Sequence, residues 1–440
     1  MTSWHAAYAW LPGGVQADVR LVETDGTLTA VTPGTAPQPG DERLAGVVLP
    51  GLANGHSHAF HRALRGRTHG DGGTFWTWRE QMYAVAARLD PDTYRDLARA
   101  VFAEMALAGY TVVGEFHYLH HAPGGRAYAD PNAMGAAVLD AAAEAGLRIT
   151  LLDTVYLAGG LSAAGHQPLD EVQRRFSDGD VDAWHARVAA LRPTATSRIG
   201  AAAHSVRAVP AAALADLARA TGDRPVHVHL SEQPAENAAT AACYDRTPAQ
   251  LLDDAGLLGE RTTAVHATHL TDDDVVRLGA TRTAACFCPT TERDLADGIG
   301  PARRLLDVGS PLTLGSDSQA VVDPFEELRG LEAHERLLSG ERGRFTPGEL
   351  VTAASAAGYA SLGWDGGRLA AGVPADFVAV RTDTVRTTGA RPDQIAYAAT
   401  GADVDRVVVA GRTIVRDGEH VLGDPVRLLR RALDDLEADA

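Results

Sequence analysis

The middle of the chain alternates between helix-like and strand-like segments, and no other pattern in the sequence narrows the choice of fold as far. Alanine-rich stretches such as PDTYRDLARAVFAEMALAG are followed by short β-branched runs such as RITLLDTVY and PVHVHLS. At least seven such alternations between residues 48 and 365 are typical of a parallel-sheet α/β fold. They predict a (β/α)8 barrel of the TIM type, with a doubly wound sheet as the alternative.

The two ends of the chain follow a different pattern. Residues 1–47 and 366–440 contain short β-like runs that are separated by turns rich in glycine and proline, and the last residues have the spacing of an amphipathic helix. We therefore expect both ends to pair into one small β-rich domain that also carries the C-terminal helix. Residues 48–365 would form the barrel domain.

Composition excludes several classes of protein. The formal net charge of −17 opposes general attraction to nucleic acid or to an anionic membrane. No stretch reaches the roughly 18 apolar residues of a membrane span, and three cysteines are too few for a disulfide framework. We expect a cytoplasmic protein that binds neither nucleic acid nor membrane. An anionic substrate would need a local cluster of arginines.

The chain contains no lysine, so all 40 of its basic residues are arginine. A lysine amine is required for Schiff-base chemistry, for the phosphate-binding P-loop and for the carboxylated lysine that bridges two metals in some hydrolases. All three are therefore excluded.

Residues of metal-ligand type stand where predicted strands give way to loops: His56 and His58 in NGHSH, His227 and His229 in PVHVHLSE, His266 in AVHATH, and Asp317 in LGSDS. In a parallel barrel the carboxyl ends of all strands open onto one face, so these residues would converge there. Two histidines one residue apart on a strand point to the same side. A third histidine and an aspartate would complete a site for a divalent metal, either zinc or iron(II).

This pattern resembles the amidohydrolase superfamily, whose members hold one or two metals at the mouth of a (β/α)8 barrel and hydrolyse amides, esters or amidine-type C–N bonds. The resemblance extends over nearly the whole chain. It implies that the metal ligands are His56, His58, His229 and Asp317, whereas His227 does not match a ligand position. Because the bridging lysine is missing, a centre with one metal per chain is favoured, most simply Zn²⁺.

The same resemblance assigns residues to the chemistry. Glu232 matches the glutamate that shuttles protons in the deaminases of the superfamily, and His266 matches the histidine that helps to activate water. Deamination needs a base, an acid and a Lewis acid at one carbon. Asp317, Glu232 and the metal could fill these roles in that order, with His266 assisting.

Three other stretches are similar to the formimidoylglutamate deiminase family: GTFWTWREQMYAVAARLDP at 73–91, VGEFHYLHH at 113–121 and AAHSVRAV at 202–209. The TTERDLADGI run at 290–299 agrees with them. The resemblance implies deimination of N-formimino-L-glutamate to N-formyl-L-glutamate and ammonia, a step of histidine degradation, by a homodimer. The substrate would be held by Arg79, Tyr118, His204 and Arg207. Planar arginine guanidinium groups suit its two carboxylates.

Two positions depart from that family. The chain has His61 where a glutamine is usual and Gln319 where a histidine is usual. Both would lie near the barrel mouth, and we expect His61 to contact the substrate.

Three alternative functions follow from the same residues. A deaminase acting on another amidine or a purine predicts stacking aromatic side chains and no arginine pair. A metal-free, non-catalytic scaffold of the same fold predicts eroded ligand positions, and all four are intact here. A nucleic-acid editing deaminase is opposed by the negative charge and the lack of basic runs.

Overall fold

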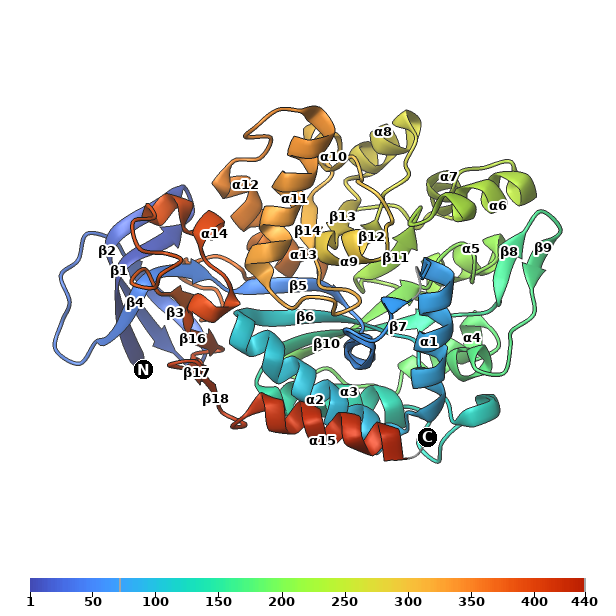
Figure 1. Cartoon of the computed structure of the whole chain (residues 1–440), viewed down its shortest axis with the longest axis horizontal. Helices are drawn as coiled ribbons and strands as arrows, with labels where there is room; N and C mark the ends of the chain where they lie inside the picture. Colours follow the sequence, from blue (N-terminus) through green and yellow to red (C-terminus); the bar gives the residue numbers. More distant parts are fainter. Residues whose placement is uncertain (71–72, 439–440) are drawn as a thin grey trace.

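The protein is built around two sheets, each of eight strands, in the computed structural model, which describes residues 1–70 and 73–438 (Figure 1). The first sheet is formed by β5 (Leu52–Ser57), β6 (Tyr110–His117), β7 (Arg148–Val155), β10 (Ser197–Ala203), β11 (Val226–Leu230), β12 (Thr262–His266), β13 (Ala284–Phe287) and β14 (Leu312–Leu314).

These eight strands follow one another around the sheet in chain order, and every neighbouring pair is parallel. The ring is closed by a parallel bridge between Ser57, at the end of β5, and Asp317, just after β14. The prediction of a (β/α)8 barrel is confirmed, and the doubly wound alternative is wrong. All strand ends that carry the predicted ligands therefore open onto one face.

The second sheet takes strands from both ends of the chain. It contains β1 (Thr2–Leu11), β2 (Gly14–Thr24), β3 (Thr27–Thr32) and β4 (Glu42–Pro50) from the N-terminal end, and β15 (Phe377–Val380), β16 (Val404–Val409), β17 (Arg412–Arg416) and β18 (Glu419–His420) from the C-terminal end. The two halves join where β4 pairs antiparallel with β15. We propose that residues 1–47 and 366–440 form one domain and residues 48–365 the other, although the first boundary falls within β4, which continues to Pro50, and the second falls ahead of β15.

Helices surround the barrel (Figure 1). They are α1 (Phe75–Arg88), α2 (Pro91–Ala108), α3 (Ala133–Ala145), α4 (Val181–Val188), α5 (Ala211–Ala220), α6 (Pro234–Tyr244), α7 (Pro248–Asp254), α8 (Asp272–Thr281), α9 (Pro289–Asp294), α10 (Ala302–Asp307), α11 (Pro324–Ser339), α12 (Pro347–Thr352) and α13 (Gly358–Ser361), with α14 (Ile395–Ala398) and α15 (Pro425–Ala438) nearer the C-terminus. A short hairpin of β8 (Gly160–Ser162) and β9 (Gly165–Gln167) follows β7. The C-terminal helix α15 packs on the barrel helix α2. Within the described residues, no helix combines the length and apolarity that crossing a bilayer would require.

Local sequence explains where the barrel helices begin and end, and α2 is an example. Asp90 caps its N-terminus, with reciprocal hydrogen bonds to Thr93, and Pro91 occupies the first turn, where its missing N–H costs nothing. Gly109 ends the helix in a left-handed conformation with φ of 109°. The chain enters β6 at the next residue, so the end of this helix fixes where the strand starts.

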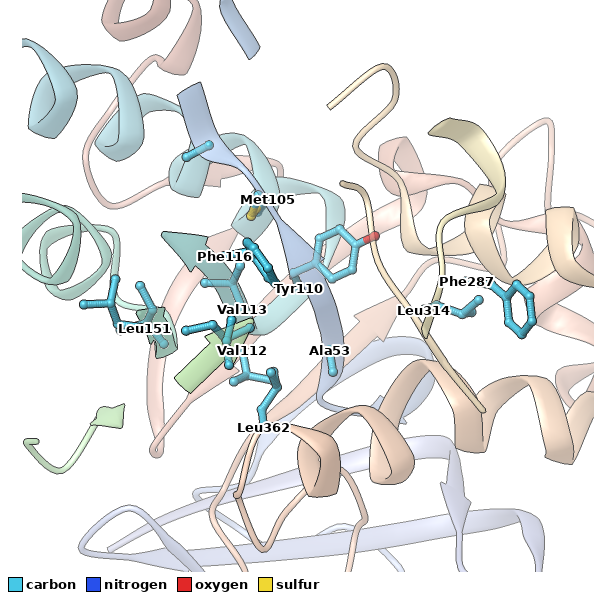
Figure 2. Packing of buried hydrophobic residues seen from close by; sticks show 14 of the residues in the cluster. Ala53, Met105, Tyr110, Val112, Val113, Phe116, Leu151, Phe287, Leu314 and Leu362 are labelled. Atoms are coloured by element: carbon cyan, nitrogen blue, oxygen red, sulfur yellow. The ribbon is translucent and has the colours of Figure 1, made fainter. Parts of the chain in front are cut away.

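The main apolar core lies in and around the barrel wall. Figure 2 shows Val112, Phe116 and Leu151 of β6 and β7 in one cluster with Leu362 from the segment after α13. All four side chains are buried, and those on β6 and β7 are so because parallel barrel strands are covered on both faces. Burying each large apolar side chain of this kind contributes about 1.5–3 kcal/mol, which gives the strand ends a rigid base.

A buried ion-pair network joins β7 to α4. Arg187 donates from Nη1 to Asp153 Oδ2 at 3.0 Å and from Nη2 to Asp153 Oδ1 at 2.8 Å, and it also contacts Asp178. Trp184 Nε1 donates to the same Asp153 carboxylate at 2.9 Å. The Asp153 side chain is fully buried. Although burial alone would raise its pKa, Arg187 holds the pKa of Asp153 below its ordinary value.

Replacing Arg187 with methionine should lower the free energy of unfolding by about 3–5 kcal/mol, because it leaves an uncompensated charge on Asp153 inside the protein. Urea denaturation measures the change. The double variant Asp153→Asn with Arg187→Met removes both charges and should be less destabilised than the single variant. A double variant whose loss equals the sum of the two single losses would show that the pair is not coupled.

Candidate metal centre and active site

The two histidines of NGHSH come from the closing strand of the barrel. His56 lies in β5 and His58 directly follows it, and both are buried. His56 Nε2 and His58 Nε2 lie 3.3 and 3.4 Å from the same atom, Asp317 Oδ1. His56 and His58 therefore converge on Asp317, a predicted ligand that stands more than 250 positions later in the chain.

Asp317 is held in place by the bridge that closes the barrel. Its backbone N–H donates to the carbonyl of His56 at 3.0 Å, and its carbonyl accepts from the N–H of His58 at 3.1 Å. Gly315 makes this approach possible, because a Cβ there would lie 2.7 Å from the His56 carbonyl oxygen. Asp317 itself adopts a positive φ of 43°, in the left-handed region.

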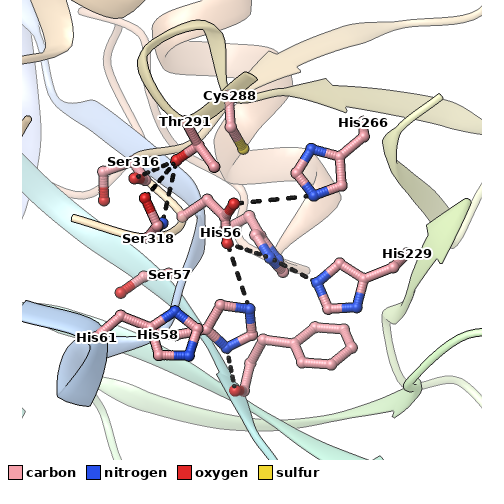
Figure 3. Close-up of polar contacts among 12 residues, drawn as sticks. His56, Ser57, His58, His61, His229, His266, Cys288, Thr291, Ser316 and Ser318 are labelled. Atoms are coloured by element: carbon pink, nitrogen blue, oxygen red, sulfur yellow. Dashed lines mark hydrogen bonds and ion pairs between the residues drawn. The ribbon is translucent and has the colours of Figure 1, made fainter. Parts of the chain in front are cut away.

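His229 and His266 complete the cluster from β11 and β12. Figure 3 shows their rings beside His56, and His229 Nε2 lies 3.1 Å from His56 Nε2. His266 Nε2 lies 3.8 Å from Asp317 Oδ2, and its ring stacks on that of His229. The other histidine of β11, His227, instead contacts the carbonyl of Ser361 at 3.1 Å, which agrees with its exclusion as a ligand.

Potential ligand atoms in this region form two groups that share Asp317, and in each group all atoms lie within 4.8 Å of one another. One group contains His56, His229 and His266, and the other contains His58 and His61. The predicted set of His56, His58, His229 and Asp317 thus spans both groups. His266 and His61, which sequence reasoning assigned to catalysis and to substrate binding, are equally close to the cluster.

The donor chemistry of the cluster fits a divalent metal. Nδ1 of His58 contacts the carbonyl of Phe116 at 3.0 Å, and Nδ1 of His229 contacts the carbonyl of His204 at 2.8 Å. A carbonyl can only accept, so in each neutral ring Nδ1 carries the proton and Nε2 presents a lone pair to the cluster. His56 Nδ1 is buried and has no hydrogen-bond partner among the described residues.

The protonation states of these histidines and of Asp317 also fit a divalent metal. Burial lowers the pKa of His56 and of His229 well below the ordinary histidine value, and it lowers the pKa of His58 to about 4. Burial would raise the pKa of Asp317, but His266 and His58 hold it below its ordinary value. Neutral imidazoles and an ionised carboxylate are the ligand forms that a catalytic zinc or similar ion requires.

Two carboxylates flank His266. Its Nε2 lies 3.7 Å from Glu232 Oε1, and its Nδ1 lies 3.5 Å from Glu292 Oε1. Burial alone would lower the pKa of His266, but Glu232 and the other nearby carboxylates raise it well above its ordinary value. Sequence reasoning did not identify Glu292, which also accepts from the backbone N–H of Cys288 at 2.8 Å. Glu292 is the glutamate of the TTERDLADGI run, and this run is the part of the sequence that could have indicated its role.

The predicted substrate residues line a small cavity of about 60 Å³ beside the cluster, and His61, Arg79, Tyr118, His204 and Arg207 all belong to its wall. His61 Nε2 contacts Tyr118 Oη at 2.9 Å. Arg79 lies over the rings of Trp76 and Tyr83, at 4.9 and 5.4 Å from their centroids. A second cavity of about 360 Å³ shares Arg79, His204 and Arg207 with the first, so the two adjoin.

His61 and Gln319, which both depart from the family pattern, occupy different environments. His61 lines the cavity. Gln319 is fully buried, donates to Ser57 Oγ at 2.9 Å and accepts from Ser316 Oγ at 2.9 Å. Gln319 therefore links the turn that carries Asp317 to the strand β5, which carries His56. It supports the site and does not line the cavity.

Comparisons with known proteins identify the family. A profile of the Amidohydrolase family matches residues 47–414, and a profile of the formimidoylglutamate deiminase HutF N-terminal domain matches residues 1–45. The chain is 38% identical over 439 residues to a formimidoylglutamate deiminase of Pseudomonas aeruginosa, with 96% of each chain covered. A 5-methylthioadenosine/S-adenosylhomocysteine deaminase of Haloarcula marismortui is 29% identical and covers 95% of this chain and 93% of its own.

Among solved structures, an amidohydrolase from Brucella melitensis superposes with a TM-score of 0.92 at 32% identity, covering 99% of this chain and 100% of its own. A zinc-bound adenosine deaminase from Xanthomonas campestris shares the fold, with a TM-score of 0.83 at 23% identity over 99% of this chain and 98% of its own. The chain therefore belongs to the amidohydrolase family, and its N-terminal strands carry the domain that marks the formimidoylglutamate deiminases within it.

Proposed function

We propose that the chain is a metal-dependent hydrolase that converts N-formimino-L-glutamate and water into N-formyl-L-glutamate and ammonia, a step of histidine degradation. The observation that carries this proposal is the pair Arg79 and Arg207 in the wall of the cavity that also contains the cluster around Asp317. The substrate has two carboxylates, and a protein with a net charge of −17 needs short-range cations to hold them. The 38% identity to a formimidoylglutamate deiminase supports the same reaction.

We propose one divalent metal per chain, most simply Zn²⁺ with Fe²⁺ also suited, held by His56, His58, His229 and Asp317. When bound, such an ion supplies a Lewis acid and lowers the pKa of water towards neutrality. The lone pairs of His58 and His229 and the ionised Asp317 provide the donors for it.

The protons are moved by residues of this chain. Asp317 takes a proton from the attacking water as the water oxygen bonds to the formimino carbon. Glu232 delivers the protons of the water to the departing nitrogen, which leaves as ammonia when its C–N bond breaks. His266 contacts both carboxylates, at 3.7 Å from Glu232 and 3.8 Å from Asp317. Glu232 raises the pKa of His266 well above its ordinary value, so its ring faces both carboxylates as a cation and assists them.

The formimino end would occupy the small cavity, where His61, Tyr118 and His204 surround it. About 60 Å³ is too small for the whole substrate, so the glutamate part would extend between Arg79 and Arg207 into the adjoining cavity of about 360 Å³. A purine substrate is supported less well. Aromatic side chains such as Trp78 and Tyr156 do line the site, but a neutral purine offers no carboxylate to either arginine.

Replacing either arginine with methionine should lower kcat/KM for formimino-L-glutamate by about 30-fold or more, because a charge-assisted contact is lost in a desolvated site. Steady-state ammonia release gives the value. The informative comparison uses a formimino compound that lacks the side-chain carboxylate. The unaltered protein should strongly prefer formimino-L-glutamate, and at least one of the two variants should erase that preference.

Arg430→Met, at an exposed position on α15, is the matched control and should leave both rates unchanged. If Arg79→Met and Arg207→Met discriminate between the two compounds as the unaltered protein does, the substrate assignment is wrong, although the metal centre could still stand.

We also propose that the protein is a cytoplasmic homodimer. The family resemblance implies the dimer, and the three free cysteines suit a reducing compartment. Sedimentation equilibrium and cell fractionation test the two parts separately.

A further inference from the structure

Arg207 has two carboxylate partners in the wall of the cavity. Its Nη2 donates to Glu232 Oε2 at 3.1 Å, and its Nε lies 2.8 Å from Glu236 Oε2. The second contact is an ion pair without a hydrogen-bond angle, since neither atom has a hydrogen-bond partner among the described residues. One guanidinium thus faces both the glutamate assigned to proton transfer and a glutamate to which sequence reasoning gave no role.

Glu236 is held by the backbone as well as facing Arg207. It lies in the first turn of α6, and its side chain is fully buried. Its Oε1 accepts from the backbone N–H of Ser231 at 2.9 Å. Ser231 belongs to the loop between β11 and α6 and has a positive φ of 51°. The Glu236 carboxylate is therefore held by backbone on one side and faces Arg207 on the other.

The position of Glu236 leaves part of the guanidinium available. Arginine presents five N–H donors in a planar fork, and a partner at Nε leaves the two Nη groups able to grip a carboxylate. Arg207 and Glu236 both line the cavity of about 360 Å³, into which the glutamate part of the substrate would extend. Nη2 donates to Glu232, and a substrate carboxylate could replace Glu232 there.

We propose that Glu236 is a positioning residue, which anchors Arg207 through Nε so that its Nη groups exchange Glu232 for a carboxylate of the substrate. This inference rests on the proposed function and deepens it. The exchange releases Glu232 from Arg207 when the substrate binds. Binding of a carboxylated amidine therefore frees Glu232 for proton transfer. A neutral amidine leaves Glu232 tied to Arg207, and this adds to the preference for anionic substrates.

The variant Glu236→Gln tests the anchor with little change of shape. Its amide can keep the bond from Ser231, but an NH₂ group then faces Arg207 Nε, donor against donor. We expect kcat/KM for formimino-L-glutamate to fall about 10-fold or more, mainly through KM, whereas kcat/KM for N-methylformamidine, which has no carboxylate, stays within about 2-fold. Glu236→Asp should recover part of the loss. Glu171→Gln, at an exposed position, is the matched control.

A double-variant cycle separates this role from a structural one. If Glu236 acts through Arg207, the variant carrying both Glu236→Gln and Arg207→Met should be no worse than Arg207→Met alone. Additive losses, or an equal loss on N-methylformamidine, would overturn the proposal. So would a Glu236→Gln variant with an unchanged KM for formimino-L-glutamate.

Binding of glutarate, an inert dicarboxylate, keeps the two proposals distinguishable. Calorimetry should show glutarate binding weakened about 10-fold by Glu236→Gln and by Arg207→Met, with no further loss when they are combined. If the unaltered protein fails to turn over formimino-L-glutamate, the proposed function is wrong, but the glutarate cycle still decides the role of Glu236. Absence of glutarate binding, or binding that is indifferent to Glu236→Gln, would overturn the anchor itself.

Discussion

Glu232→Gln should leave a folded, metal-loaded protein whose turnover of formimino-L-glutamate is lower by about 10²–10⁴-fold, the usual range for removal of a proton-transferring group. Glu232 stands 3.7 Å from His266 and 3.1 Å from Arg207, so it faces the reacting atoms but is outside the proposed ligand set. Glutamine keeps the size of the side chain and can still contact Arg207 through its carbonyl oxygen. What it loses is the ability to accept and return a proton.

The measurement combines the rate of ammonia release with metal analysis of the same sample. His266→Ala should behave in a similar way, because His266 faces both carboxylates and assists them. The assigned role of Glu232 would be wrong if Glu232→Gln turned over at a near-normal rate. It would also be wrong if that variant lost its metal, since Glu232 would then be a ligand.

Asp317→Asn is expected to have an effect of similar or larger size by another route, through loss of the metal. Changes to residues that only support a metal ligand typically weaken metal affinity by 10–100-fold, so loss of a charged ligand should cost about 100-fold or more. Asp317 belongs to both groups of potential ligand atoms. His56 and His58 lie 3.3 and 3.4 Å from one of its oxygens. Asparagine is neutral and would leave these rings without their anionic partner.

Elemental analysis after dialysis measures this effect. The unaltered protein should hold one divalent metal per chain, and Asp317→Asn should hold much less and show no measurable turnover. Asp273→Asn, at an exposed position on α8, serves as the control and should match the unaltered protein. Two metals per chain at full occupancy, or full metal content in Asp317→Asn, would contradict the proposed centre.

The predicted substrate contacts show how far sequence motifs reach. Two separate motifs predict Arg79 and Arg207 as substrate contacts, and both line the wall of one cavity. The pairing of Arg207 with Glu236 could not be predicted, because it depends on how the first turn of α6 packs beside the loop after β10. A motif identifies which residue belongs to a site, but the partners of that residue come from other elements.

His61 and Gln319 show that a residue predicted at the barrel mouth need not line the cavity. Sequence reasoning placed both at the barrel mouth, yet only His61 lines the cavity. Gln319 has a positive φ of 61° and turns inwards to Ser57 and Ser316. Backbone conformation at a single residue decided this, and no residue pattern in the sequence records it.

The sequence by itself determined the barrel and the identity of the residues at its mouth. Alternating helix and strand periods are local properties, and in a parallel barrel they leave little choice of architecture. Histidines and an aspartate at strand ends must then gather on one face, whatever the details of packing. The absence of lysine likewise excluded a carboxylated-lysine bridge without any knowledge of the structure.

Only the tertiary structure decided how those residues are arranged. It placed His266 and His61 as close to the cluster as the predicted ligands, put Glu292 beside His266, and closed the barrel with the bridge between Ser57 and Asp317. These contacts join elements that are far apart in the chain. They depend on the register between strands and on the rotamers of packed side chains, which are set by the completed core and cannot be read from local sequence patterns.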